Sequence, residues 1–166
     1  MAERLRELEA YKVKKIVSGC QTGVDRAALE IAMEFGIPVG GWCPKGRMAE
    51  DGPIDAKYPL QETNSTDYAI RTMLNVRDSH GSLVLTKGIP TGGTALTIKR
   101  AKGFDKDYLI VDLGKECDAA NIKEWLFGNL IDTLNIAGPR ESSFPGIYDQ
   151  TTLFLRRLFE YMPFKK

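Results

Sequence analysis

The chain has 166 residues, of which 43% are hydrophobic and 27% are charged, and its formal net charge is +1. This length and composition are typical of a globular protein with its own core, and they exclude the disordered and fibrous classes. We therefore predict a single domain over residues 1–166. The near-neutral charge argues against nucleic acid as a partner, because affinity for a phosphate backbone requires clustered cations.

Three cysteines stand far apart in the chain, at Cys20, Cys43 and Cys117. Their odd number and wide spacing favour neither a disulfide framework nor a CxxC metal site, so a reducing cytoplasm is the expected location. Residues 1–15 mix acidic and basic side chains without an apolar stretch, unlike a signal peptide. No apolar run approaches the ~18 residues that cross a bilayer, and we expect a soluble protein with no membrane partner.

The first half of the chain opens with apolar residues at helical spacing among charges, which predicts a peripheral helix over residues 1–12. The elements expected next are a strand over 14–19, a helix over 24–33 that ends at Gly36, and a strand over 37–42. Proline and glycine are then so frequent that residues 43–66 are predicted to form a long loop without regular structure. Ser65 or Thr66 is the expected cap of a helix over 68–76 with one apolar face.

The second half alternates strands and helices three times. The expected elements are a strand over 81–86, a helix over 94–101, a strand over 108–113, a helix over 119–127, a strand over 133–137 and a closing helix over 148–161. Such alternation implies a parallel sheet covered by helices on both faces. The predicted fold class is therefore α/β, with a Rossmann-like parallel sheet in three layers.

A glycine-rich turn follows the first predicted strand and opens the helix after it. Its candidate ligand-binding residues are Gly19, Cys20, Gln21, Thr22, Gly23, Asp25 and Arg26. Glycines let the backbone approach a ligand, and the amides at a helix start favour an anion. The alternative is a tight turn in which Thr22 or Asp25 only caps the helix. Cys20 lies where a helix start lowers the pKa of a thiol, although a lone cysteine in such a turn is more often packed than reactive.

A second glycine turn links the third strand to its helix and contains Lys87, Thr91, Gly92, Gly93 and Thr94. Two such turns of one parallel sheet open onto the same edge, so their helix starts are expected to converge on one ligand at a topological switch point. The threonine hydroxyls and the lysine charge suit a phosphate. An N-cap with a flexible turn is the alternative.

Charged residues outside the glycine turns add to the candidate site. Lys45 and Arg47 on the long loop are predicted to act as a clamp, with a solvated charged loop as the alternative. Arg140, Glu141 and Ser142 follow the last strand at the same edge and are predicted to hold an anion or a heterocycle, unless they form only a loop ion pair.

His80 is the only histidine, so a Ser-His-Asp relay would need it as the base. It is predicted at a helix-to-strand turn, away from the carboxyl edge where ligands bind. A structural or solvent-facing role is therefore expected for this side chain.

Several longer motifs occur together and in a fixed order. They read SGCQTGVDRAALEIA, GWCPKGRMAEDGPI, YPLQET, RTMLNVRDSHG, TGGTALT and AGPRESSFPGIY. In this order they resemble the molybdenum-cofactor carrier proteins, which form part of the YpsA-like branch of the nucleotide-binding superfamily that includes the LOG and DprA proteins. The resemblance covers residues 16–147.

The resemblance implies a Rossmann-like fold, a homo-oligomer (dimer or tetramer), and binding of molybdenum cofactor, a pterin with one phosphate and a dithiolene-held metal oxide. A nucleotide is the alternative small anionic ligand. Carried over by motif, the binding positions are Gly19 to Arg26, Lys45 and Arg47, Thr91 to Thr94, and Arg140 to Ser142. They agree with the positions found from the residues alone.

The chain departs from its relatives, which usually carry glycine at the position of Cys20 and an acid at that of His80. Cys20 is therefore expected to bring a thiol toward the pocket. LOG phosphoribohydrolases follow their Gly-Thr with catalytic glutamates, whereas Ala95, Leu96 and Thr97 follow Gly93-Thr94 here. This favours a carrier or storage protein over an enzyme acting on a nucleotide, for which Glu50, Asp51 or Glu141 would be the carboxylate. No residue is assigned to catalysis or to a metal.

Overall fold

The computed structural model describes residues 1–162. Its central sheet has five strands in the order β2-β1-β9-β7-β8, and every neighbouring pair is parallel. The strands are β1 (Lys15–Val17), β2 (Val39–Gly40), β7 (Gly81–Thr86), β8 (Asp107–Asp112) and β9 (Thr133–Ala137). The predicted α/β class with a Rossmann-like parallel sheet is confirmed.

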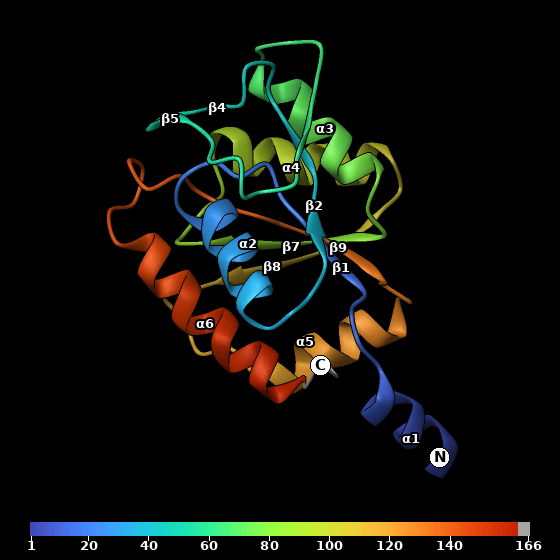
Figure 1. Cartoon of the computed structure of the whole chain (residues 1–166). Helices are drawn as coiled ribbons and strands as arrows, with labels where there is room; N and C mark the ends of the chain where they lie inside the picture. The colour runs from blue at the N-terminus through green and yellow to red at the C-terminus, as the bar shows by residue number, and fades with distance from the viewer. Residues whose placement is uncertain (163–166) are drawn as a thin grey trace.

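Helices cover both faces of the sheet and give three layers (Figure 1). One face carries α2 (Val24–Glu34), α5 (Ala119–Gly128) and α6 (Ile147–Tyr161), and the other carries α3 (Tyr68–Arg77) and α4 (Gly92–Gly103). α1 (Ala2–Ala10) lies outside the layers against α5, and none of its residues is buried. Within residues 1–162, no helix has both the length and the apolar character needed to cross a bilayer.

The strand order identifies where a ligand has access to the sheet. Counted from β7 and passing from the last strand back to the first, the order becomes 2-1-3-4-5, which is that of a doubly wound sheet. The direction of winding then reverses between β7 and β9. In such sheets ligands bind outside the carboxyl ends of the strands at this reversal, so the loops after β7 and β9 form the expected crevice.

The central strands are buried on both faces because helices lie above and below them. Their side chains are fully buried at Ile16, Leu83, Leu85, Leu134 and Ile136. The ring of Phe159 in α6 meets that of Phe35 at the end of α2 edge to face, with 5.7 Å between ring centroids. This core fixes the strands whose ends form the crevice.

The predicted strand over 37–42 is interrupted at Gly41. This glycine has φ +127° and lies so close to β1 that a Cβ would come within 2.4 Å of the Ser18 carbonyl oxygen. The chain therefore leaves the central sheet after β2 and forms β3 (Trp42–Cys43) beside it.

The prediction of a loop without regular structure over 43–66 was wrong in part. β3 pairs with β6 (Gln61–Glu62), and β4 (Met48–Ala49) forms an antiparallel hairpin with β5 (Gly52–Pro53). Gly41 and Pro44 border β3, and β5 itself consists of glycine and proline, which limits the length of both strands. The predicted cap of α3 was also wrong, since Asp67 accepts the hydrogen bond from the Ala69 amide at 2.9 Å.

His80 has the structural role that its position predicted. Its Nδ1 atom accepts hydrogen bonds from the backbone amides of Thr133 at 3.0 Å and Asp132 at 3.3 Å. The side chain thereby joins the turn before β7 to the start of β9, at the edge of the sheet opposite the crevice.

Candidate functional site

A cavity of about 160 Å³ lies at the carboxyl ends of β7 and β9. Separate segments of the chain contribute to its lining, among them Gln21 and Asp25, Arg71, Thr91 to Thr94, and Arg140. The turns after three strands therefore meet at one place, as the strand order requires. Thr22, one residue from the lining, binds the loop after β9 through a hydrogen bond from the Glu141 amide to its hydroxyl oxygen at 3.1 Å.

The start of α4 presents free backbone donors to the cavity. Thr91 occupies the N-cap position, and the amides of Thr94 and Ala95 donate back to its carbonyl oxygen at 3.2 Å. Within residues 1–162, the amides of Gly92 and Gly93 donate no hydrogen bond. Free amides at a helix start carry partial positive charge and bind anions.

Gln21 contributes a further donor with a fixed orientation. Its side-chain oxygen accepts hydrogen bonds from the backbone amides of Thr22 at 3.0 Å and Glu50 at 2.8 Å. Because both amides need an acceptor, the atom that they contact is Oε1, and the remaining terminal atom of the side chain is the donor Nε2. The residue is only 5% exposed, and Nε2 is buried with no partner among residues 1–162. A buried donor that lines a cavity is satisfied when a ligand supplies an acceptor.

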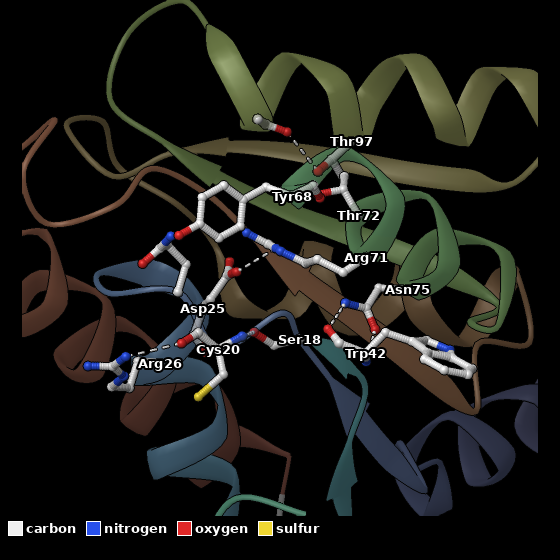
Figure 2. A network of polar contacts seen from close by, with 12 residues as sticks. Ser18, Cys20, Asp25, Arg26, Trp42, Tyr68, Arg71, Thr72, Asn75 and Thr97 are labelled. Carbon is white, nitrogen blue, oxygen red and sulfur yellow. Dashed lines mark hydrogen bonds and ion pairs between the residues drawn. The ribbon is translucent and has the colours of Figure 1, made fainter. Parts of the chain in front are cut away.

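Arg71 crosses from α3 to the first glycine turn and forms a buried ion pair with Asp25 (Figure 2). Its Nη1 atom lies 3.1 Å from Asp25 Oδ2, and the two side chains are 11% and 4% exposed. Burial raises the pKa of the Asp25 carboxyl, and the Arg71 charge acts against this shift. Because both residues line the cavity, its wall contains a charged pair that water reaches poorly.

Two arginines share the ring of Tyr68. The guanidinium of Arg71 lies 5.6 Å from the ring centroid and that of Arg140 lies 5.5 Å from it. Cation–π contacts at these distances orient planar guanidinium groups. Tyr68 thus positions one arginine from its own helix and one from the loop after β9.

Sequence reasoning missed Tyr68 and Arg71. The sequence predicted that α3 buries an apolar face, yet the buried residues of this helix include the polar Thr72 and Asn75. Asn75 Oδ1 accepts a hydrogen bond from the Trp42 backbone amide at 2.7 Å, and Asn75 Nδ2 donates one to the Trp42 carbonyl oxygen at 3.0 Å. The spacing of Tyr68, Arg71, Thr72 and Asn75 was the available signal, because residues three and four apart share one helix face.

The glycines of the first turn make room for protein rather than for a ligand. A Cβ at Gly19 would lie 2.0 Å from Nη1 of Arg71. Gly23 has φ +78°, and a Cβ there would lie 2.4 Å from the Pro139 carbonyl oxygen. The turn therefore contributes to the cavity through Gln21 and Asp25, while its glycines let Arg71 and the loop after β9 approach.

The carboxylates of the long loop hold it against the site. Glu50 accepts hydrogen bonds from the Thr22 hydroxyl and from the amide and hydroxyl of Ser142, the last two at 3.1 and 2.6 Å. Arg26 pairs with Asp51 and donates to the Cys20 carbonyl oxygen at 3.2 Å. Both carboxylates are thus occupied within the protein.

The predicted clamp cations do not line the cavity. Arg47 donates to the carbonyl oxygens of Ile54, Asp55 and Tyr58 at 3.3, 2.8 and 3.0 Å, so it organises the loop itself. Lys45 and Lys87 are also absent from the cavity lining. Glu141 accepts from the amides of Gly146 and Tyr148 and caps α6.

Cys20 does not bring its thiol into the cavity. It is fully buried in the hydrophobic core and has φ +58°. Burial raises the pKa of the thiol to about 12, although the nearby Arg26 acts in the opposite direction. Desolvation therefore outweighs the helix start, and the thiol stays protonated at neutral pH.

The parallel sheet with a cavity at its switch point places the protein in the class of Rossmann-like α/β proteins. The model of the circularly permutated YpsA SLOG family matches residues 16–159. The chain therefore belongs to this family, and the resemblance inferred from the motifs is confirmed.

A solved structure described as "Putative molybdenum carrier protein", from Syntrophus aciditrophicus SB, is similar to this chain. The two are 45% identical with a TM-score of 0.86, over 88% of this chain and 94% of the other. No curated protein matches the chain. The strand order agrees with the family description, because renumbering the strands from β7 restores a doubly wound order.

Proposed function

We propose that this protein binds the phosphate of a small ligand at the start of α4, and that it carries or stores molybdenum cofactor. The observation that carries the proposal is a set of donors around one cavity: the amides of Gly92 and Gly93, Nε2 of Gln21, and the guanidinium groups of Arg71 and Arg140. Donors of this kind suit a phosphate. The molybdenum carrier name of the similar structure supports this choice of ligand.

The residues present fit the cofactor as cargo. Its phosphate meets the amides and arginines described above, while its metal is held by its own dithiolene sulfurs. The protein is therefore not required to supply a metal cage. Within residues 1–162, no group of three or more His, Cys, Asp and Glu side chains has the arrangement of a metal site.

The assembly and location proposed with this function are those implied by the family. We propose that the chain is one domain, that it forms a homo-oligomer (dimer or tetramer), and that it works in the cytoplasm. Free thiols at Cys20, Cys43 and Cys117 support a reducing compartment. Light scattering after size-exclusion chromatography tests the subunit number.

The first experiment identifies the ligand. The purified protein is analysed by mass spectrometry, by fluorescence of oxidised pterin and by molybdenum analysis. Recovery or titration of a pterin phosphate without turnover supports the carrier. A protein that binds neither pterin phosphate nor inorganic phosphate would contradict it.

The second experiment tests the site. Arg140→Leu and Gly93→Leu should each weaken phosphate binding about tenfold or more, because one removes a charge-assisted donor and the other fills the helix start. The midpoint of thermal unfolding should change little, since a Cβ at Gly93 meets open space and Arg140 is partly exposed. Arg77→Leu, on the exposed end of α3, is the matched control.

One observation favours a second candidate, an enzyme acting on a nucleotide. Asp25 lines the cavity, and burial raises the pKa of its carboxyl, as in groups that act as general acids. Cleavage of a nucleoside monophosphate at its glycosidic bond, abolished by Asp25→Asn, would establish this function. Binding without cleavage supports the carrier.

A further inference from the structure

The cavity is small compared with the ligand proposed for it. Its volume is about 160 Å³, whereas pockets that enclose a drug-sized ligand measure roughly 300–1,000 Å³. The donors around it are suited to a phosphate, which is much smaller than a drug-sized ligand. The remainder of an organic phosphate must therefore lie at the mouth of the cavity.

The mouth carries two apolar side chains that are open to solvent. Ile89, on the loop after β7, is 87% exposed, and Phe144, on the loop after β9, is 37% exposed. Both line the cavity. The two loops follow neighbouring parallel strands, so both border the crevice between them.

We propose that Ile89 and Phe144 clamp a planar heteroaromatic ring whose attached phosphate occupies the cavity. This inference rests on the proposed function and adds to it the two side chains that hold the ring of the ligand. Phe144 offers a face or an edge for ring stacking, and Ile89 offers an aliphatic surface. The ring then covers apolar surface that is otherwise exposed, while the phosphate satisfies the buried donors.

Pterins and nucleotide bases share this chemistry, and the geometry of the mouth suits either. Nothing in the clamp requires a hydrogen bond to the ring, because both side chains are apolar. The ring is therefore recognised by its shape and its apolar faces, and the phosphate supplies the charge that anchors it.

Isothermal titration with paired ligands tests the clamp. AMP and ribose 5-phosphate differ only in the heteroaromatic ring, and a phosphorylated pterin provides the second ring. In the unaltered protein AMP or the pterin phosphate should bind more tightly than ribose 5-phosphate. In Ile89→Ser the affinity ratio of ring-bearing to ring-free phosphate should fall about tenfold, and Phe144→Ser should act in the same direction.

The control is Leu153→Ser, which removes a 53% exposed leucine from α6, outside the cavity. It should leave the ratio as in the unaltered protein. An unaltered ratio in both Ile89→Ser and Phe144→Ser would overturn the clamp while phosphate binding still stands. Failure of inorganic phosphate and ribose 5-phosphate to bind the unaltered protein would overturn the proposed function and the clamp with it. Whichever of AMP and the pterin phosphate binds with the higher affinity identifies the kind of ring that the protein prefers.

Discussion

At the scale of single residues, Arg71 contacts several parts of the candidate site. Its guanidinium pairs with Asp25, lies beside the Tyr68 ring and occupies the space that a side chain at Gly19 would need. Its Nε atom is buried and has no partner within residues 1–162. An arginine so placed is held in one orientation.

Gly19→Ala should displace the Arg71 side chain, because the added Cβ would lie 2.0 Å from Nη1. Loss of the ion pair leaves the buried Asp25 carboxylate without its partner, and we expect a loss of about 1–3 kcal/mol in the free energy of unfolding. Phosphate affinity should fall as well. Denaturant unfolding and phosphate titration measure the two effects, with Gly128→Ala, where a Cβ meets open space, as the control. Full affinity in Gly19→Ala would show that the position of Arg71 is unimportant.

The three cysteines should differ in reactivity toward a thiol reagent such as Ellman's reagent. Burial raises the pKa of the Cys20 thiol to about 12 and also raises that of Cys43, so neither forms much thiolate at pH 8, and both are inaccessible. Cys117 is exposed and should react in the folded protein, although its pKa is also raised by partial burial. We expect one equivalent to react before unfolding and the other two after it. Rapid loss of the Cys20 thiol in the folded protein would contradict its placement in the core.

The residues of the cavity differ in how far the sequence could predict them. Gly93 lies at the start of the helix after β7, and Arg140 lies in the loop after β9. Both positions belong to the carboxyl edge of a parallel sheet, so the predicted topology places them there. Arg71 lies on a helix, and its contact with Asp25 depends on how α3 is rotated over the sheet. That rotation is set by long-range packing such as the Asn75 contacts to Trp42, which no local pattern reports.

At the scale of elements, the loop between β3 and α3 is fastened to the site by its own charges. Glu50 binds Thr22 and Ser142, and Asp51 pairs with Arg26. Burial alone would raise the pKa of Glu50, but hydrogen bonds from Ser142 and Thr22 and the Arg140 charge together lower it. The hydrogen bond and charge of Arg26 lower the pKa of Asp51.

Acid should therefore weaken this attachment. Each carboxylate has a lower pKa in the folded state than in the unfolded state, so its contribution to stability is present above the unfolded value of about 4 and is lost as the pH falls through the folded value. The free energy of unfolding should decrease over this range. Glu50→Gln should lose about 1–2 kcal/mol at neutral pH and show a flatter decrease in acid. Denaturant titrations between about pH 3 and pH 7 measure both slopes, and equal slopes would exclude Glu50 as a contributor.

The strands and helices differ in how well a sequence pattern predicts them. The alternation of apolar runs and helix formers predicted a strand or helix at the place of each element in the central layers, although β2 (Val39–Gly40) ends earlier than the predicted strand over 37–42. The two-residue strands of the long loop are too short to show a period, and they form where they pair, β3 with β6 and β4 with β5. The break at Gly41 likewise results from the closeness of Ser18, a contact between separate segments.

At the scale of the whole molecule, the first and last helices of the described chain contact the same helix. Nζ of Lys123 in α5 donates to the Glu9 carbonyl oxygen of α1 at 3.4 Å and lies 6.0 Å from the Tyr161 ring centroid of α6. The strand order becomes a standard doubly wound order when it is read from β7. The fold thus depends on the packing of its βα units more than on where the chain starts.

A rearranged chain should therefore fold to the same structure. Opening the chain between Asp78 and Ser79 and joining its two ends with a flexible linker makes β7 the first strand of the central sheet. Glu9 and Tyr161 both contact Lys123, and domains whose terminal segments lie close together tolerate such rearrangement. We expect a loss of about 1 kcal/mol from the broken turn and a midpoint of thermal unfolding lower by about 2–4 °C. Phosphate affinity should be retained, because both loops of the crevice stay continuous, and circular dichroism with phosphate titration would check it. A rearranged protein that folds but loses phosphate binding would mean that the α3–β7 connection positions Arg71, rather than the packing of α3 alone.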